Sequence, residues 1–455
     1  MLFSGIPFLY YFLPLVLAVY FLAPAGWKNA VLAFFSLLFY GWGEPVYLLL
    51  LVLTLTFTYG MGRLAGRAAP ERLWAVTAAA VTVQLLLLVV FKYAGLLFLG
   101  GGKTVFPLPL GISFYTFQMV SYTVDLYRGS VKPARSLVDF AAYAAAFPQL
   151  IAGPIVRYQE VDQQMAHRRH SADAFYAGLR RFLVGLGKKV LLANQLALLG
   201  ETFRRSAEPS VLFYWLYAVS FTLQIYFDFS GYSDMAVGLG KLFGFTYPEN
   251  FRYPYTSRSI TEFWRRWHIT LGGWFRDYVY IPLGGSRVKR GRWLFNMLAV
   301  WTLTGLWHGA SWTFAVWGVL YAALMIGEKW LWGGWLKKHS VSARLYTLLF
   351  VTLGFVLFQA ESFSQAGSDL MALFGMGNNP LVSTEAVYCL RSYGWLLFVS
   401  AVGCTPLPHR LWEKMTSRGG RLWAAGETLL LAGLLLLVTA YLVDGSFNPF
   451  LYFRF

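Results

Sequence analysis

The sequence predicts an all-α polytopic membrane protein, with about ten or eleven transmembrane helices plus re-entrant segments around a central tunnel. Of the 455 residues, 57% are hydrophobic and only 13% are charged, whereas a soluble domain carries about 25% charged residues. Apolar runs of about 20 residues, long enough to cross a bilayer, recur along the whole chain. The Lys and Arg residues gather between these runs, which is the bias expected of cytoplasmic loops.

The apolar runs are the expected spans. The first of them has no Lys or Arg before it, so we expect an uncleaved span and no secretory signal peptide. The runs lie near Pro7–Leu22, Ala30–Tyr40, Val46–Tyr59, Trp74–Leu99, Arg181–Leu199, Val211–Phe227, Leu294–Leu306, Trp312–Ile326, Leu345–Phe358, Ser392–Val402 and Glu427–Val443.

The formal net charge of +17 does not indicate a nucleic-acid partner, because the basic residues lie in short connections between apolar runs. Such connections suit anionic lipid head groups, so we expect a multi-pass protein of the cell (inner or plasma) membrane, with membrane lipids as partners. The basic connections are Arg63–Arg72, Arg128–Arg135, Arg168–Lys189, Arg287–Arg292, Lys337–Arg344 and Arg410–Arg421.

Two apolar stretches, Pro107–Asp125 and Phe140–Val156, are interrupted by Pro, Gly and polar residues. Irregular backbone at membrane depth is tolerated only where protein or water satisfies it, which favours re-entrant segments that line a cavity. Ordinary kinked helices would give the same pattern, so both interpretations stay open.

The stretch from Phe221 to Trp312 carries ionisable residues inside sequence that otherwise resembles membrane spans. Such groups are costly to bury in a bilayer and mark a functional site by default. Gln224 and Asp228 share a helix face, and Gly231 permits a break before Asp234. With Ser230 between them, the two carboxylates are predicted either to hold basic partners and shape a polar tunnel that orients substrate, or to cap helices on both sides of that break.

The next motif, TEFWRRWHITLGGWF, is predicted to be a helix that Thr261 caps and that an ion pair between Glu262 and Arg266 supports. Arg265 precedes the histidine by three residues, and the following YIPLGGSRVKRGRW is expected to form a basic surface turn. Four residues would share one face of this helix and would place an imidazole in an aromatic wall: Trp264, His268, Leu271 and Phe275.

The third motif, LTGLWHGASW, places Trp307 and His308 at the end of an apolar run, before small residues that permit close approach. An imidazole in a dry pocket suits removal of a proton from an acceptor hydroxyl. No G-x-S-x-G motif supports a serine nucleophile, and His268 and His308 lack the spacing of a metal motif. We therefore expect no bound metal. Cys389 and Cys404 are expected to act as small hydrophobes.

These motifs carry a resemblance to a known family. The runs QIYFDFSGYSDMAVGLGKLFGF, NFRYPYTSRSITEFWRRWHITLGGWFRDYVYIPLGG and LTGLWHGASW resemble the membrane-bound O-acyltransferase family. Almost the whole chain, from MLFSGIPFLYYFLPLVLAVYFL to PFLYFRF, is similar to its bacterial polysaccharide branch. The resemblance implies a single membrane domain over residues 1–455, with a catalytic core at about 107–330.

The resemblance also implies an activity. The family's essential histidine corresponds to His308 and its second characteristic position to His268, with no bound cofactor. The substrate would be a cytoplasmic acyl thioester, acetyl-CoA or an acyl carrier protein. Acetyl groups would reach an exported polysaccharide such as alginate through an extracytoplasmic acetyltransferase partner. D-alanyl transfer for teichoic acids remains an alternative.

Two functions outside enzymology stay open at this stage. The polar residues could line the path of a channel or transporter for an anionic or lipid-linked substrate, since TEFWRRWH could also bind phosphate. The abundant Trp and Tyr could instead belong to a purely structural assembly subunit. Cleavage of a thioester donor distinguishes the enzyme from both.

Overall fold

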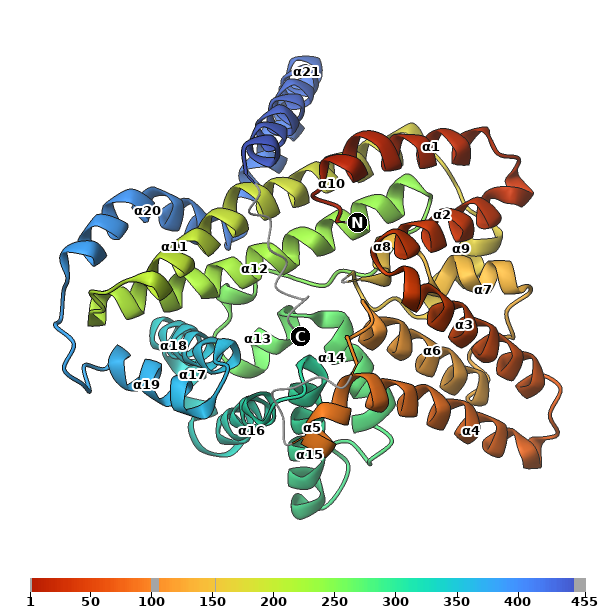
Figure 1. The fold of residues 1–455 in the computed structure, drawn as a ribbon, viewed down its shortest axis with the longest axis horizontal. Helices are drawn as coiled ribbons and strands as arrows, with labels where there is room; N and C mark the ends of the chain where they lie inside the picture. The colour runs from red at the N-terminus through yellow and green to blue at the C-terminus, as the bar shows by residue number, and fades with distance from the viewer. Residues whose placement is uncertain (1, 100–105, 152, 446–455) are drawn as a thin grey trace. The chain divides into compact units, whose positions relative to one another are not determined.

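The computed structural model describes residues 2–99, 106–151 and 153–445 (Figure 1). Within these ranges the regular secondary structure is helical and includes no strand, and one isolated antiparallel bridge pairs Phe251 with Trp267. The described chain divides into two compact units, each built from several separate segments. This confirms the all-α prediction, while the central tunnel stays a prediction.

Unit 1 comprises Met1–Phe182, Tyr232–Glu249 and Gly273–Val279. Its core is rich in buried aromatic rings: Phe3, for example, stacks on Tyr232 with ring centroids 4.6 Å apart. The helices that lie wholly in this unit are α1 (Leu13–Leu22), α2 (Lys28–Gly43), α3 (Pro45–Ala65), α4 (Pro70–Leu88), α5 (Ala94–Leu99), α6 (Ile112–Tyr127), α7 (Leu137–Ala144), α8 (Phe147–Leu150) and α9 (Tyr158–Ala166).

Unit 2 comprises Leu183–Gly231, Asn250–Gly272 and Tyr280–Phe455. Its last helix, α21, is interrupted at Gly420, where φ is +53°. The helices that lie wholly in this unit are α11 (Asn194–Arg205), α13 (Ile260–Arg266), α15 (Arg290–His308), α16 (Trp312–Gly327), α17 (Gly333–Lys338), α18 (Ser340–Gln359), α19 (Phe363–Leu373), α20 (Thr384–Gly403) and α21 (Leu407–Asp444). Three further helices contribute residues to both units: α10 (Ala172–Gly187), α12 (Val211–Leu242) and α14 (Ile269–Phe275).

Seven helical segments of the described chain are long and apolar enough to cross a membrane. This supports a multi-pass membrane protein, although the predicted count of ten or eleven spans stays a prediction. Phe8–Leu22 is a shorter apolar helix. The seven segments are Pro45–Ala65, Pro70–Phe98, Ala172–Arg205, Trp312–Lys338, Ser340–Gln359, Thr384–Gly403 and Leu422–Asp444.

Two of the predicted basic connections are wrong. Most of Arg168–Lys189 forms helix α10 at the start of a candidate span, and Lys189 is only 2% exposed. Arg410–Arg421 lies within α21. Basic residues within a helix and in a loop look alike in sequence, because Lys and Arg are good helix formers.

The two interrupted stretches are buried within unit 1. In the first, α6 begins after Gly111, whose φ is +72°, and nearly all its residues are buried. In the second, the short helices α7 and α8 are followed by non-helical backbone in which Ile155 and Val156 are buried. The irregular backbone of the second stretch is thus covered by protein, as its polar groups require. The choice between re-entrant segments and kinked helices remains open.

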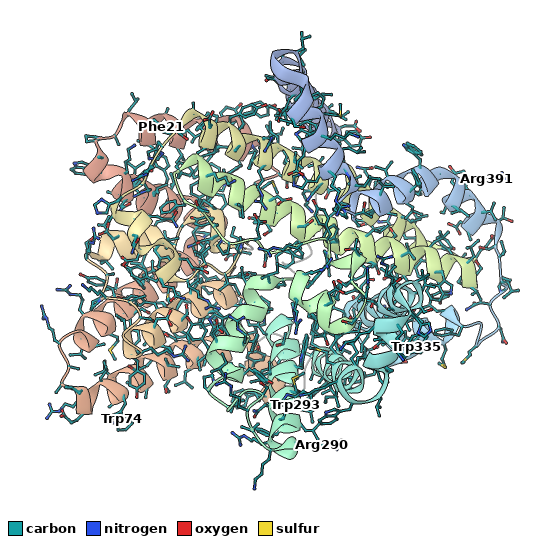
Figure 2. All side chains as sticks on the ribbon, turned by 180° about the vertical axis from the view of Figure 1, so that it is seen from behind. Phe21, Trp74, Arg290, Trp293, Trp335 and Arg391 are labelled. Carbon is teal, nitrogen blue, oxygen red and sulfur yellow. The ribbon has the colours of Figure 1, made fainter. Side chains whose placement is uncertain are left out.

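Helices α15 and α16 of unit 2 pack unusually closely. A Cβ on Gly305 would lie 2.1 Å from the carbonyl oxygen of Phe314, and one on Gly318 would lie 2.1 Å from that of Trp301. Gly309 faces the Phe314 ring in the same way, which confirms the expected close approach after His308. Helix α15 begins at Arg290, which Figure 2 labels together with Trp293. The close contacts with α16 lie toward the other end of α15, where His308 is located.

Candidate functional site

His268 lies in a short non-helical link between α13 and α14 of unit 2. Its φ is +47°, a left-handed conformation that is uncommon for residues other than glycine. The prediction that Trp264, His268, Leu271 and Phe275 share one helix face is therefore wrong, because α13 ends at Arg266. The backbone there pairs with another segment instead: the Arg252 amide donates to the Arg266 carbonyl, and the Ile269 amide to the Asn250 carbonyl.

Asn250 holds the His268 ring. The Asn250 Oδ1 atom lies 3.2 Å from His268 Nδ1 and accepts hydrogen bonds from the amide and hydroxyl of Thr270. Because a backbone amide can only donate, the atom facing it must be the amide oxygen, and His268 Nδ1 must then carry the proton. His268 Nε2 is left with its lone pair and has no hydrogen-bond partner among the described residues.

His308 is the last residue of α15 and is 4% exposed. Aromatic rings surround it. Its imidazole centroid lies 5.0 Å from Trp307, 5.3 Å from Trp317 and 5.2 Å from Phe358, with the rings nearly perpendicular in each case. This arrangement excludes water from the imidazole, and the close packing of α15 against α16 sets its position.

Both imidazoles contact the same side chain, the indole of Trp307. Trp307 contacts His308 at 5.0 Å and His268 at 5.8 Å between ring centroids. On its other side His268 meets Phe229 edge to face, with centroids 4.7 Å apart. Both imidazoles are buried and close enough to influence each other electrostatically. Two residues from separate motifs thus form one cluster within a single unit.

The predicted joint at Gly231 is wrong, because α12 runs unbroken from Val211 to Leu242. Gly231 instead allows close packing: a Cβ there would lie 2.8 Å from the Gly185 carbonyl oxygen. The predicted basic partner of Asp228 is confirmed, because Asp228 caps no helix and forms an ion pair with Lys189 at 2.5 Å, with both side chains almost fully buried. A buried carboxylate in such sequence requires a paired cation, and Lys189 was hidden in a supposed loop.

Asp234 belongs to unit 1, whereas His268 and His308 belong to unit 2. Its carboxylate pairs with Arg181 at 2.9 Å, and Arg181 also binds Glu249 through both terminal nitrogens. This arrangement fits a structural clamp between helix α10 and the end of α12. A role for Asp234 in orienting substrate stays a prediction.

The other residues proposed from the sequence occupy different environments in unit 2. Trp264 packs against Trp317, 5.4 Å away, and Trp317 in turn contacts His308. Arg265 is exposed on α13 and, in the described chain, makes no hydrogen bond to either imidazole. Gln224 and Ser230 are buried on α12. Their participation in a substrate path stays a prediction.

The N-terminus of α13 is held by a carboxylate that sequence reasoning missed. Glu328, 7% exposed within a candidate span, accepts hydrogen bonds from the backbone amides of Ile260 and Thr261. The N-cap is Ser259 rather than the predicted Thr261. The predicted pair between Glu262 and Arg266 is confirmed at 2.5 Å.

Of the two residues that sequence reasoning missed, Glu328 had a signal in the sequence and Asn250 did not. Glu328 is an acidic residue inside the apolar run LMIGEKWLW, which by itself indicates a partnered buried group. Asn250 gave no comparable signal, because asparagine after proline and glutamate reads as an ordinary turn. Its role depends on a contact that only the folded chain creates.

The described residues contain no cluster of three or more potential metal ligands. Cys389 and Cys404 are buried and unpaired thiols, in agreement with their expected role as small hydrophobes.

The fold and the site together define a polytopic helical membrane protein with a buried pair of histidines. Residues 132–360, about half of the chain, match the description "MBOAT, membrane-bound O-acyltransferase family". The chain belongs to this family, and it is a membrane O-acyltransferase.

Several relatives cover most of both sequences. The probable alginate O-acetylase of Azotobacter vinelandii is 42% identical over 395 residues, which is 83% of this chain and 79% of the relative. The probable alginate O-acetylase of Pseudomonas putida is 36% identical over the whole length of both chains. The peptidoglycan O-acetyltransferase of Helicobacter pylori is 33% identical, covering 85% of this chain and 82% of the relative.

A teichoic acid D-alanyltransferase of Bacillus subtilis is also similar, at 31% identity. This match covers 56% of this chain and 69% of the relative. The similarity to the O-acetyl-transferring relatives therefore extends over considerably more of the chain.

Proposed function

We propose that this protein moves acetyl groups from a cytoplasmic thioester donor across the membrane, for O-acetylation of an exported polysaccharide such as alginate. The observation that best supports this mechanism is that His268 and His308 are both buried and both contact the indole of Trp307. The longer and stronger similarity to O-acetyl-transferring relatives favours acetyl over D-alanyl transfer.

In this proposal His308 is the general base. Its imidazole takes the proton of the acceptor hydroxyl while the hydroxyl oxygen forms a bond to the thioester carbonyl carbon. The carbon–sulfur bond then breaks, and the leaving thiolate takes the proton back from the imidazolium. The products are an O-acyl ester and a free thiol, so the transfer needs no metal or redox partner.

His268 positions the acceptor. Its Nδ1 proton is directed to Asn250, so the ring is fixed in orientation and positions the acceptor by contact, while the single proton of the acceptor hydroxyl goes to His308. The aromatic rings around His308 keep water away, which limits hydrolysis of the thioester. Acetyl-CoA or an acetylated carrier protein would be the donor, and an extracytoplasmic acetyltransferase of the same pathway would be the partner.

The test is donor cleavage by the purified protein in detergent. We would supply acetyl-CoA or acetylated carrier protein together with alginate as the hydroxyl acceptor, and measure the released thiol for the native chain, H308A and the control H339A, which alters an exposed histidine. Thiol release by the native chain and H339A, but not by H308A, supports the proposal. An intact donor in every sample, with protein that remains folded, would instead favour a transporter.

A further inference from the structure

Unit 1 contains a cavity with a volume of about 300 Å³. It lies where three helices end: α1 ends at Leu22, α10 begins at Ala172 and α12 ends at Leu242. Phe21, labelled in Figure 2, lies near the end of α1 and is one of the lining residues. The lining residues are Phe21, His170, Ser171, Ala172, Phe175, Lys241 and Leu242.

The polar side of the cavity is basic. Lys241 lines it directly, and the Lys28 ammonium lies 5.5 Å from the Phe21 ring centroid. Arg168 donates a hydrogen bond to the Tyr20 hydroxyl at 3.0 Å, and the Tyr20 ring contacts His170. No carboxylate is among the lining residues in the part of the chain that the structure describes. The charges therefore favour an anion.

His170 adds a neutral polar group. Burial lowers the pKa of His170, and the neighbouring charges of Lys28 and Arg168 lower it further, so the ring is uncharged at neutral pH. The turn at Gly244, where φ is +81°, makes room for this ring, because a Cβ there would lie 2.8 Å from His170 Cε1. The position of the imidazole is thus built into the fold.

The other side of the cavity is apolar and open. Phe21 and Phe175 pack with centroids 5.9 Å apart, and Phe21 is 43% exposed. The next residue along the chain, Leu22, is 86% exposed. A ligand that satisfies both sides must carry an anionic group next to a hydrocarbon portion.

The cavity also lies at the ends of two apolar helices. Ala172 is the first residue of the candidate span Ala172–Arg205, and Phe8–Leu22 is an apolar helix that ends beside it. The ends of spans meet the head-group layer, and basic pockets between such ends bind anionic phospholipid head groups.

We propose that this cavity binds the phosphate of an anionic phospholipid, with Lys241, Lys28 and Arg168 around the phosphate and Phe21 and Leu22 against the acyl chains. A bound head group would fix the position of unit 1 at the membrane surface. Lipid binding here requires no acyl transfer, so a result that rejects the proposed function would not reject this site.

The test measures lipid binding to the full-length protein in detergent. Phosphatidylglycerol and phosphatidylcholine would be titrated separately, with binding read by native mass spectrometry and by thermal stability. Inorganic phosphate and CoA are two further arms, because both offer phosphate without a diacyl tail. Selective binding of phosphatidylglycerol by the native chain is the expected result.

The sharpest variant is S171D. The Ser171 hydroxyl caps α10 by accepting from the Ala174 amide at 3.1 Å, and aspartate caps helices equally well. The variant should fold normally while its new negative charge repels phosphate. The matched control is S362D, which makes the same change at the N-cap of α19, where Ser362 accepts from the Gln365 amide.

Each lysine should contribute about fivefold to affinity, as expected for one basic side chain at an anionic membrane surface. The double variant K28Q/K241Q should therefore lose most of its preference for phosphatidylglycerol, as should S171D, while S362D retains it. Equal lipid binding by the native chain, S171D and K28Q/K241Q would overturn the proposal. Binding of CoA or inorganic phosphate with the same dependence on these variants would overturn the assignment to a lipid.

Discussion

The two imidazoles of unit 2 are held in different ways. His268 lies in strained, non-helical backbone, and a hydrogen bond from its Nδ1 to Asn250 fixes its tautomer. His308 ends a regular helix among aromatic rings, and close packing of α15 against α16 sets its position. Hydrogen bonds therefore place one ring and packing places the other. We expect substitutions to affect the two residues by separate routes.

The largest expected effect separates the two roles directly. H308A should lower the rate of acyl transfer by about 10²- to 10⁴-fold, the usual contribution of a general base. H268A should lower it by a smaller factor, because the positioning residue transfers no proton. Single-turnover thiol release from a saturating donor measures both. A larger loss in H268A than in H308A would exchange the two assignments.

Removal of the hydrogen bond behind His268 is expected to have the next largest effect. N250A should reduce kcat by about 10-fold, as loss of a hydrogen bond of roughly 1.4 kcal/mol would do, with little change in KM for the thioester. The control N296A also removes a buried amide of unit 2, one that donates to the carbonyls of Leu283 and Gly285.

N296A should lower thermal stability while kcat in the folded fraction stays near the native value. The comparison of kcat per folded molecule therefore separates positioning from general support of the fold. Equal losses of kcat in N250A and N296A would remove Asn250 from the positioning of His268.

The packing behind His308 can be tested at Gly318. G318A would place a Cβ 2.1 Å from the Trp301 carbonyl oxygen, so α15 and α16 must separate. Such overpacking costs about 1–3 kcal/mol of stability, and the rate should fall with it as His308 shifts. Thermal unfolding in detergent and thiol release measure the two effects.

Gly367 provides the matched control, because it lies within α19 and has no atom within 4 Å of the Cβ position. G367A should be neutral or stabilising by up to about 1 kcal/mol, since alanine favours helix. A G318A protein as stable as the native chain would show that the close approach of the two helices is not required.

The smallest effect is expected at the exposed ion pair of α13. Glu262 binds Arg266 at 2.5 Å, but both side chains are about one-third exposed. E262Q should therefore change stability by only about 0.3–0.5 kcal/mol and leave the rate unchanged. A tenfold loss of rate in E262Q would show that this pair, rather than Asn250, controls the position of His268.

The sequence by itself determined the class of the protein and the residues that carry its chemistry. The bilayer constrains each segment separately. The apolar runs and basic connections could therefore be recognised one by one, as could polar residues that are costly to bury, such as His268 and His308. The pair between Glu262 and Arg266 was equally predictable, since neighbours on one helix turn meet wherever the helix goes.

Only the tertiary structure decided how those residues meet. Gly231 could break a helix or pack tightly against another, and Asp228 could cap a helix or pair with Lys189; partners distant in the sequence settled both. The same holds for Asn250, whose hydrogen bond to His268 exists because residues 250–252 pair with the link after α13. Local preferences allow several conformations there, and the need to satisfy buried polar groups selects one.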